Sequence, residues 1–188
     1  MLLGGDGNDS IIGGRGDDTA LLGAGDDEFI WNPGDGSDIV EGQAGADSLL
    51  FNGANIAERI DISANGGRVR FTRDVANITM DVNDVETIAF RALGGSDVIT
   101  VNDMSGTDLT QVNVDLGASG GGDDGAADQV VVNGTAGGDA IAVTSTGGVF
   151  SVIGLAAVGL QEVIAVAAGD DVRAAAISKQ RIVAVAAK

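Results

Sequence analysis

A glycine-rich repeat of nine residues fills the beginning of this chain and limits what it can fold into. Five units lie between residues 4 and 50, and in each a glycine-rich turn leads to an aspartate and then to an apolar residue. The units are GGDGNDSII (4–12), GGRGDDTAL (13–21), LGAGDDEFI (22–30), PGDGSDIVE (33–41) and GQAGADSLL (42–50). One such unit is too short to bury its apolar side alone, so the units must stack into a solenoid.

Two positions of the repeat are identical in all five units, and a third is always apolar. The sixth position is Asp9, Asp18, Asp27, Asp38 and Asp47, with spacings of 9, 9, 11 and 9 because Trp31 and Asn32 are inserted. The fourth position is Gly7, Gly16, Gly25, Gly36 and Gly45, and the eighth is Ile11, Ala20, Phe29, Val40 and Leu49. This pattern predicts glycine turns joined by short strands, each with one inward-facing apolar side chain.

The composition favours a cation-binding solenoid over a nucleic-acid or membrane protein. The chain has 28 acidic and 10 basic residues, a net charge of −18, which repels nucleic acid and anionic membrane surfaces. Apolar residues make up 44%, enough for a core and too many for a disordered acidic chain. No apolar stretch is long enough to span a bilayer, and no basic segment followed by an apolar run marks a signal peptide.

The residue types that are missing restrict the metal chemistry. The chain has no cysteine and no histidine, so it has no thiolate or imidazole ligand and lacks the commonest general base. Carboxylate and carbonyl oxygens remain, and these are the ligands of Ca²⁺, which takes six to eight of them at about 2.3–2.6 Å. Glycine turns point carbonyls inward, but one turn supplies too few oxygens, so two stacked turns must face each ion.

The repeat resembles the RTX (repeats-in-toxin) calcium-binding nonapeptide, G-G-x-G-x-D-x-U-x with U apolar. The match covers residues 4–50, and residues 51–143 also look like the downstream part of RTX-type proteins. The resemblance implies an all-β parallel β-roll in which two nonapeptides form one coil, so that each repeat lies beside the next but one. It also implies bound Ca²⁺ and type I secretion.

The resemblance implies about three Ca²⁺ sites in this chain. One repeat supplies carbonyls from its second and fourth positions, the next but one from its first and third, and both supply the aspartate. The first site combines Gly5, Gly7 and Asp9 with Leu22, Ala24 and Asp27. The second combines Gly14, Gly16 and Asp18 with Pro33, Asp35 and Asp38, and the third Gly23, Gly25 and Asp27 with Gly42, Ala44 and Asp47. Leu22, Pro33 and Gln43 replace repeat glycines.

Beyond the repeats, glycine-aspartate turns recur at wider intervals in GGSDVITV (94–101), AGGDAIAV (136–143) and VAAGDDVRA (166–174). Alternating strands are expected at 67–72, 112–116 and 129–133, an acidic loop at 118–128, and a short helix or a turn at 54–60. We therefore divide the chain into a β-roll (1–50), a β-solenoid continuation with wider, β-helix-like rungs (51–171) and an Ala-rich cap or truncated edge (172–188). Asp97, Asp139, Asp170 and Asp171 are interpreted as turn residues or loose cation contacts and not as ligands of a full site.

Other motifs have simpler explanations. Arg15-Gly16-Asp17 is an integrin-type tripeptide, but the turn itself demands its glycine. Phe29 and Trp31 are expected to lie one under the coil and one at its edge. Paired aspartates such as Asp26-Asp27 lie on a convex rim instead of a cleft, so no enzyme activity is expected.

The sequence thus predicts a calcium-binding β-solenoid module of a secreted bacterial protein, part of a longer polypeptide, that folds on Ca²⁺ binding outside the cell. Calcium is the expected partner, with no nucleic acid and no membrane insertion. Two alternatives remain open: an adhesive or spacer segment of a larger surface protein, and the non-catalytic tail of a secreted protease or lipase.

Overall fold

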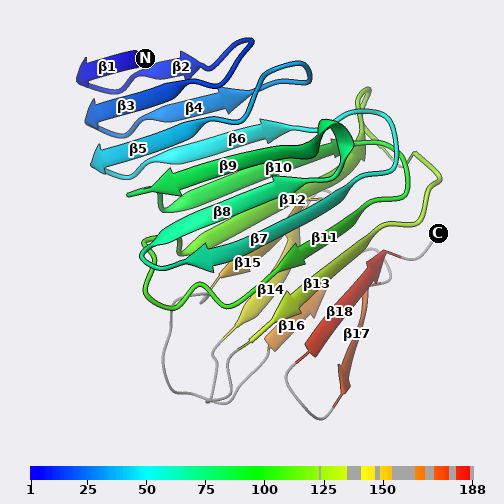
Figure 1. Ribbon diagram of the computed structural model, residues 1–188. Coiled ribbons are helices and arrows are strands. Elements are labelled where there is room, and N and C mark those ends of the chain that lie inside the picture. Colours follow the sequence, from blue (N-terminus) through cyan, green and yellow to red (C-terminus); the bar gives the residue numbers. More distant parts are fainter. Residues whose placement is uncertain are drawn as a thin grey trace.

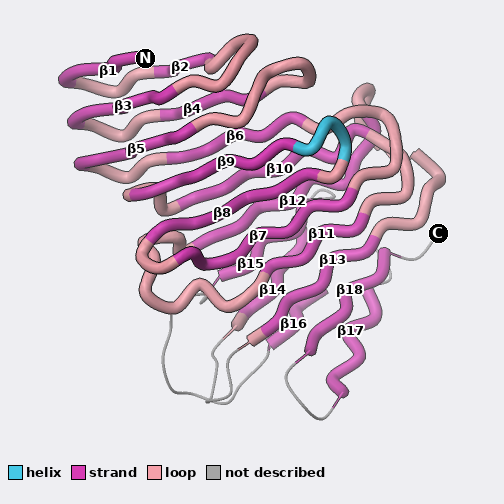
Figure 2. The backbone as a smooth tube through the Cα atoms, in the orientation of Figure 1, coloured by secondary structure: helices cyan, strands magenta, loops and turns pink. Residues whose placement is uncertain are grey.

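Two β-sheets form the body of the molecule in a computed structural model (Figure 1). The structure describes residues 1–122, 124–134, 141–146, 149–153, 164–167, 172–177 and 181–186. Apart from one 3₁₀ turn, η1 (Val75–Asn77), the regular structure in these residues is strand (Figure 2). The chain is therefore all-β, as the repeat pattern predicts.

The strands divide between a ten-stranded first sheet and an eight-stranded second sheet. In spatial order the first sheet contains β1 (Leu2–Asp6), β3 (Thr19–Ala24), β5 (Ile39–Ala44), β9 (Ile78–Asn83), β8 (Arg68–Arg73), β7 (Arg59–Asn65), β11 (Val98–Val101), β13 (Gln129–Asn133), β18 (Arg181–Ala186) and β17 (Val172–Ile177). The second contains β16 (Ile164–Ala167), β14 (Ala142–Thr146), β15 (Val149–Ile153), β12 (Gln111–Ala118), β10 (Thr87–Leu93), β6 (Ser48–Asn52), β4 (Glu28–Trp31) and β2 (Ser10–Ile12).

The nonapeptides form the parallel β-roll that the sequence predicts. Successive strands alternate between the sheets, so β1, β3 and β5 pair in parallel in one sheet and β2, β4 and β6 in the other. Leu2 lies beside Ala20, and Ala20 beside Val40, so the step between coils lengthens where Trp31 and Asn32 are inserted. Two repeats therefore make one coil.

The coil continues beyond the repeats, but its first wide rung differs from the expected continuous parallel solenoid. Strands β7, β8 and β9 form an antiparallel meander, and its outer strands pair in parallel with β11 and β5. The meander turns at Asn65-Gly66-Gly67, where Gly66 has a φ of +68°, the left-handed conformation that short hairpin turns need. Further antiparallel pairs join β12 to β15 and β13 to β18.

The core lies between the sheets, where alternate residues of the strands from β3 to β12 are buried. Trp31 and Phe51 stack with ring centroids 4.0 Å apart, and Phe71 contributes a third ring from the first sheet. The expectation that Phe29 or Trp31 lies at an edge is wrong, since both are fully buried. They are two residues apart on β4, so they share its inner face, and the Trp31 indole N–H donates to the Gly36 carbonyl at 2.8 Å.

The structure also bears on several smaller predictions. Residues 53–58 form a turn, so of the predicted helix or turn at 54–60 the turn is correct for 54–58, whereas Arg59 and Ile60 begin strand β7. Asp139, Asp170 and Asp171 lie outside the described residues.

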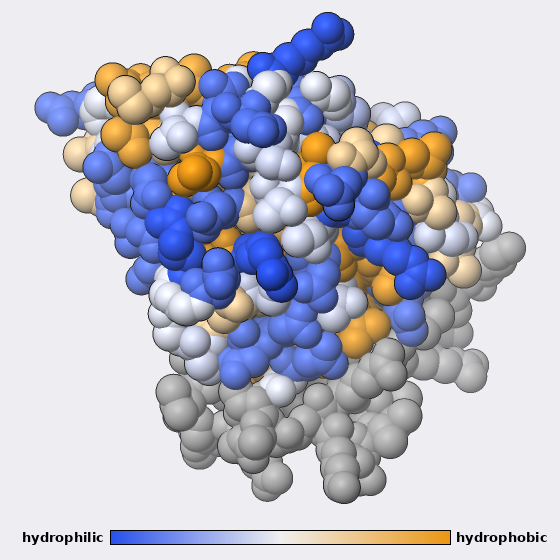
Figure 3. All heavy atoms as spheres, in the orientation of Figure 1, coloured by the Kyte–Doolittle hydropathy of each residue, from blue (hydrophilic) through white to orange (hydrophobic). Residues whose placement is uncertain are grey.

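Hydrophilic side chains cover much of the face in Figure 3, with apolar side chains in smaller groups between them. None of the described residues belongs to a helix long and apolar enough to cross a membrane.

Candidate metal centre

Turns connect the two sheets along two edges of the roll. The first edge consists of turns 7–9, 25–27, 45–47, 84–86 and 102–110, which lead from the first sheet to the second. The second edge consists of turns 13–18, 32–38, 53–58 and 94–97, together with residues 119–122 and 124–128, which lead back. Glycines with positive φ shape the repeat turns, among them Gly5 (+119°), Gly7 (+105°), Gly23 (+119°) and Gly25 (+136°). These φ values are accessible mainly to glycine, which explains the glycine pattern.

The structure distributes the predicted ligands along these two edges. Gly5 lies in β1, Leu22, Gly23 and Ala24 lie in β3, and Gly42 and Ala44 lie in β5, all at strand ends that lead into the first edge. Gly7, Asp9, Gly25, Asp27 and Asp47 lie in the first-edge turns themselves. Gly14, Gly16, Asp18, Pro33, Asp35 and Asp38 lie in the second-edge turns.

Aspartates of neighbouring coils are joined directly. The backbone N–H of Asp9 donates to Oδ1 of Asp27 at 2.7 Å, and that of Asp27 donates to Oδ1 of Asp47 at 2.9 Å. On the second edge the N–H of Asp18 donates to Oδ1 of Asp38 at 2.8 Å. Each of these aspartates thus lies beside the aspartate of the next repeat but one, and one oxygen of each acceptor carboxylate is held in place. That the two aspartates share an ion stays a prediction.

The second carboxylate oxygen has no such partner. Among the described residues, Oδ2 of Asp9, Asp27, Asp38 and Asp47 is buried without a hydrogen bond. The side chains of Asp27, Asp38 and Asp47 are only 1–2% exposed. A buried carboxylate oxygen without a partner is costly, so each of these atoms points to a ligand that would satisfy it.

Burial also makes the charge on these groups unfavourable. Desolvation raises the pKa of Asp38 to about 6, and the hydrogen bond from the Asp18 N–H offsets this only in part. The charges of Asp18, Asp35 and Asp17 raise the pKa of Asp38 further. Burial likewise raises the pKa of Asp47. Electrostatics of this kind favour a bound cation.

Backbone carbonyls of the predicted sites point from one turn to the next. A Cβ atom at Gly23 would overlap the carbonyl oxygen of Gly5, and one at Gly25 would overlap that of Gly7. The Ala24 carbonyl accepts from the Gly7 N–H at 2.7 Å, and the Ala44 carbonyl from the Gly25 N–H at 2.8 Å. These two predicted ligands are thus already engaged through one lone pair and keep the other.

The donor set fits a hard cation held by few carboxylates. In the part of the chain that is described, no three acidic side chains converge on one point. An ion at these turns would therefore combine two aspartates with backbone carbonyls, the mixture of oxygen ligands that Ca²⁺ accepts.

Two local hydrogen bonds stabilise the turn at 32–38. The Asn32 N–H donates to Oδ2 of Asp35 at 2.8 Å, and the Asp35 N–H donates to the Asn32 carbonyl at 2.9 Å. The inserted residues thus close a small loop that leaves Asp38 in register with Asp18. The second predicted site keeps its carboxylate pair despite the insertion.

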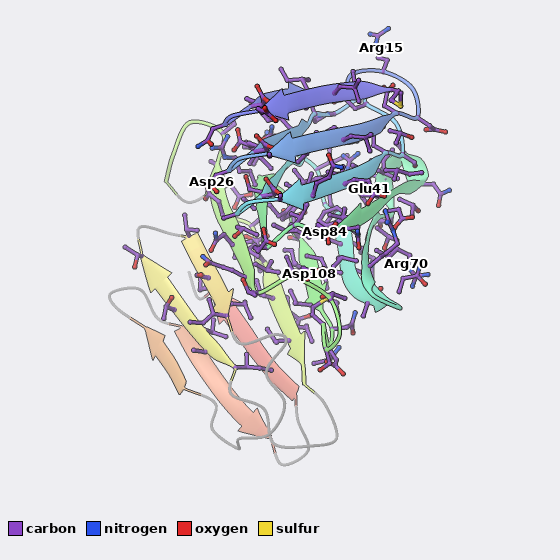
Figure 4. The ribbon with its side chains drawn as sticks, turned by 90° about the vertical axis from the view of Figure 1, so that its left-hand side faces the viewer. Arg15, Asp26, Glu41, Arg70, Asp84 and Asp108 are labelled. Carbon is purple, nitrogen blue, oxygen red and sulfur yellow. The ribbon has the colours of Figure 1, made fainter. Side chains whose placement is uncertain are left out.

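Polar residues at the fifth repeat position brace the outside of the turns, a role that the sequence analysis did not assign. Oδ1 of Asn8 accepts from the N–H of Asp26 at 3.0 Å, and Oδ1 of Asp26 accepts from the N–H of Ala46 at 2.9 Å. Asp26 and Asp84, both labelled in Figure 4, belong to turns of the first edge.

The chain of linked acidic residues continues past the repeats, which the sequence analysis also missed. The Asp47 N–H donates to Oε2 of Glu86, the Glu58 N–H to Oδ1 of Asp97, and the Asp97 N–H to Oδ1 of Asp128. Each of these acidic residues stands two positions before a buried apolar residue, as in the nonapeptides; these are Ile60, Ile88, Ile99 and Val130. This spacing of two between an acidic residue and an apolar residue can be read from the sequence, and it could have predicted these links.

Comparison with known families agrees with the geometry of the turns. The parallel β-roll and the buried aspartates at its glycine turns place the protein in the class of cation-binding β-rolls. Residues 1–29 and 34–55 match the family of the RTX calcium-binding nonapeptide repeat in four copies, with a gap that contains the Trp31-Asn32 insertion. The N-terminal part of the chain thus consists of RTX calcium-binding repeats. Comparisons with curated proteins and with solved structures gave no match.

Proposed function

We propose that this chain is a calcium-binding β-roll module of a secreted bacterial protein, and that it folds when Ca²⁺ binds outside the cell. The observation that carries the proposal is the set of buried, unpartnered Oδ2 atoms of Asp9, Asp27, Asp38 and Asp47 among the described residues. Each belongs to an aspartate that is linked to its counterpart one coil away.

We assign three sites, each between two coils. The carboxylate pairs are Asp9 with Asp27, Asp18 with Asp38, and Asp27 with Asp47. Carbonyl ligands come from Gly5, Gly7, Leu22 and Ala24 at the first site, from Gly14, Gly16, Pro33 and Asp35 at the second, and from Gly23, Gly25, Gly42 and Ala44 at the third. Bound Ca²⁺ would supply the positive charge that offsets the buried carboxylates.

Calcium binding and folding are coupled in this proposal. The chain has a net charge of −18, so without cations the stacked carboxylates repel one another and disfavour the coil. Extracellular Ca²⁺ is millimolar, and the free energy of binding then becomes free energy of folding. The low Ca²⁺ of the cytosol would keep the chain open for type I secretion. The module acts structurally and not as an enzyme.

A calcium titration of the whole chain tests the proposal. Far-ultraviolet circular dichroism should gain strand signal between chelator and millimolar Ca²⁺, and equilibrium dialysis should find at least three tightly bound ions per chain. Mg²⁺ serves as the control, because it prefers a small octahedral shell and should not induce the same transition. An unchanged strand signal would contradict the folding claim, and fewer than two bound ions would contradict the assignment of the sites.

A further inference from the structure

Asp97 is a buried aspartate that lies outside the matched repeats. It is 1% exposed and ends the turn between β10 and β11. Its Oδ1 accepts from the Glu58 N–H at 2.7 Å, and its own N–H donates to Oδ1 of Asp128 at 2.9 Å. Its Oδ2 is buried and has no hydrogen bond among the described residues. Asp97 thus has the same environment as the repeat aspartates, although it lies about forty residues beyond them.

The backbone before Asp97 has positive φ at the two positions where a repeat turn has it, and at Gly94 between them (+130°), where the repeat turn does not. Leu93 has a φ of +63° and Gly95 a φ of +104°, four and two residues before the aspartate. Gly5 and Gly7 take positive φ at the same distances before Asp9. A left-handed leucine costs about 1–2 kcal/mol, so the surrounding structure must hold this turn in place.

Oxygen atoms from three coils meet at this turn. The Gly95 N–H donates to Oδ2 of Asp124 at 2.7 Å. A Cβ atom at Gly94 would lie 2.5 Å from Oδ1 of Asn55 and 3.1 Å from Oδ2 of Asp124. The turn of Asp97 is therefore flanked by an amide oxygen from the preceding turn and by carboxylates from the following one.

A positively charged side chain forms an ion pair with the neighbouring Glu58, whereas none of the described residues forms one with Asp97. Glu58 is paired with the buried guanidinium of Arg73, and its Oε2 also accepts from the Ala54 N–H at 3.0 Å. The ion pairs of the described residues involve Arg68, Arg73 and the N-terminus, and none of them includes Asp97. Burial, together with the charges of Asp128, Glu58 and Asp124, raises the pKa of Asp97 to about 7 despite the hydrogen bond from Glu58.

We propose that Asp97 is the centre of a further Ca²⁺ site, outside the nonapeptide repeats, that joins the turns at 53–58 and 94–97 to residues 124–128. Asp97 and Asp128 supply the carboxylates, and the Asn55 amide and backbone carbonyls of the Asp97 turn supply neutral oxygens. Asp124 adds negative charge at the rim. This site does not depend on the three repeat sites, so either proposal can fail without the other.

The test compares Asp97→Asn with Asp108→Asn in the full chain. Asparagine keeps the acceptor for the Glu58 N–H but removes the charge, and Asp108 is an exposed aspartate between β11 and β12 (Figure 4). By isothermal titration calorimetry with CaCl₂, Asp97→Asn should bind one ion fewer per chain and Asp108→Asn the same number as the natural chain. An unchanged ion count in Asp97→Asn would overturn the proposal.

Two further readouts keep the test decisive. In calcium-free buffer Asp97→Asn should show at least as much strand signal by circular dichroism as the natural chain, because it removes a buried charge; a purely structural Asp97 would instead give less strand signal with and without Ca²⁺. If the variant does not fold, replacing part of the Ca²⁺ in the folded natural chain with paramagnetic Gd³⁺ should broaden the backbone amide resonances of Glu58 and Asp97 as strongly as those of Asp9, Asp18 and Asp27 at the repeat sites. Sharp Glu58 and Asp97 amides beside broadened repeat amides would also overturn the site.

Discussion

The guanidinium of Arg73 forms a buried ion pair with the carboxylate of Glu58. Glu58 precedes a core strand in the same way as the repeat aspartates do, and its N–H donates to Asp97 as theirs donate to the next coil. The antiparallel meander brings Arg73 to this turn, where its guanidinium also lies 5.4 Å from the centre of the Trp31 ring. The protein itself therefore supplies the cation at this position of the roll.

This arrangement predicts a large loss of stability in Arg73→Met. The substitution leaves Glu58 charged and buried, and breaking a buried ion pair from one side costs about 3–5 kcal/mol. Urea unfolding at saturating Ca²⁺, followed by the fluorescence of the single Trp31, measures the change. The double variant Glu58→Gln/Arg73→Met should recover much of the loss, since no unpaired charge remains. Equal losses in the single and double variants would contradict the explanation.

The hydrogen bonds between aspartates of neighbouring coils predict that Asp27→Asn and Asp9→Asn lose different numbers of bound calcium ions. Asp27 is linked to both Asp9 and Asp47, whereas Asp9 is linked only to Asp27. Asp27→Asn should therefore remove two bound ions and Asp9→Asn one, as counted by equilibrium dialysis. Asp6→Asn, an exposed aspartate of the same repeat as Asp9, is the control and should lose none. Equal ion counts in Asp9→Asn and Asp27→Asn would rule out a shared ligand.

The repeat region was readable from the sequence because its contacts follow a short, regular period. Glycines that need positive φ and one aspartate per unit determine the coil, and they predict that Asp9 lies beside Asp27 and Asp18 beside Asp38. Trp31 was misjudged because the insertion hides that it shares the inner face of β4 with Phe29.

The later part of the roll was harder to predict because its contacts join residues far apart in the sequence. Glu58 contacts Asp97 across 39 residues, and the meander between β5 and β11 breaks the period that would reveal the pair. The partnership of Arg73 with Glu58 depends on the register of β7 against β8, which local composition does not determine.

Two glycines at the same repeat position should differ in how they tolerate alanine. Gly5 and Gly23 both have a φ of +119°, but a Cβ atom at Gly5 has no neighbour within 4 Å, whereas one at Gly23 would overlap the Gly5 carbonyl. Gly5→Ala should cost about 1–2 kcal/mol from backbone strain alone. Gly23→Ala adds displacement of the neighbouring turn and should cost more than about 3 kcal/mol. Urea unfolding at saturating Ca²⁺ measures the free energy of unfolding of both variants. Similar losses in the two would show that close packing between the turns does not determine the cost of alanine.

Without calcium, the folded state should become more stable as the pH falls from about 7 to about 5. Burial raises the pKa of Asp38 to about 6 and that of Asp97 to about 7, and it also raises the pKa of Asp47. In this range the folded chain binds more protons than the unfolded chain, whose aspartates titrate near pH 4, so each proton bound favours folding. Circular dichroism of the calcium-free chain should therefore show strand content that rises on acidification. Saturating Ca²⁺ should abolish or reverse this trend because bound aspartates must be ionised, and strand content that rises with pH in calcium-free buffer would contradict the buried-carboxylate explanation.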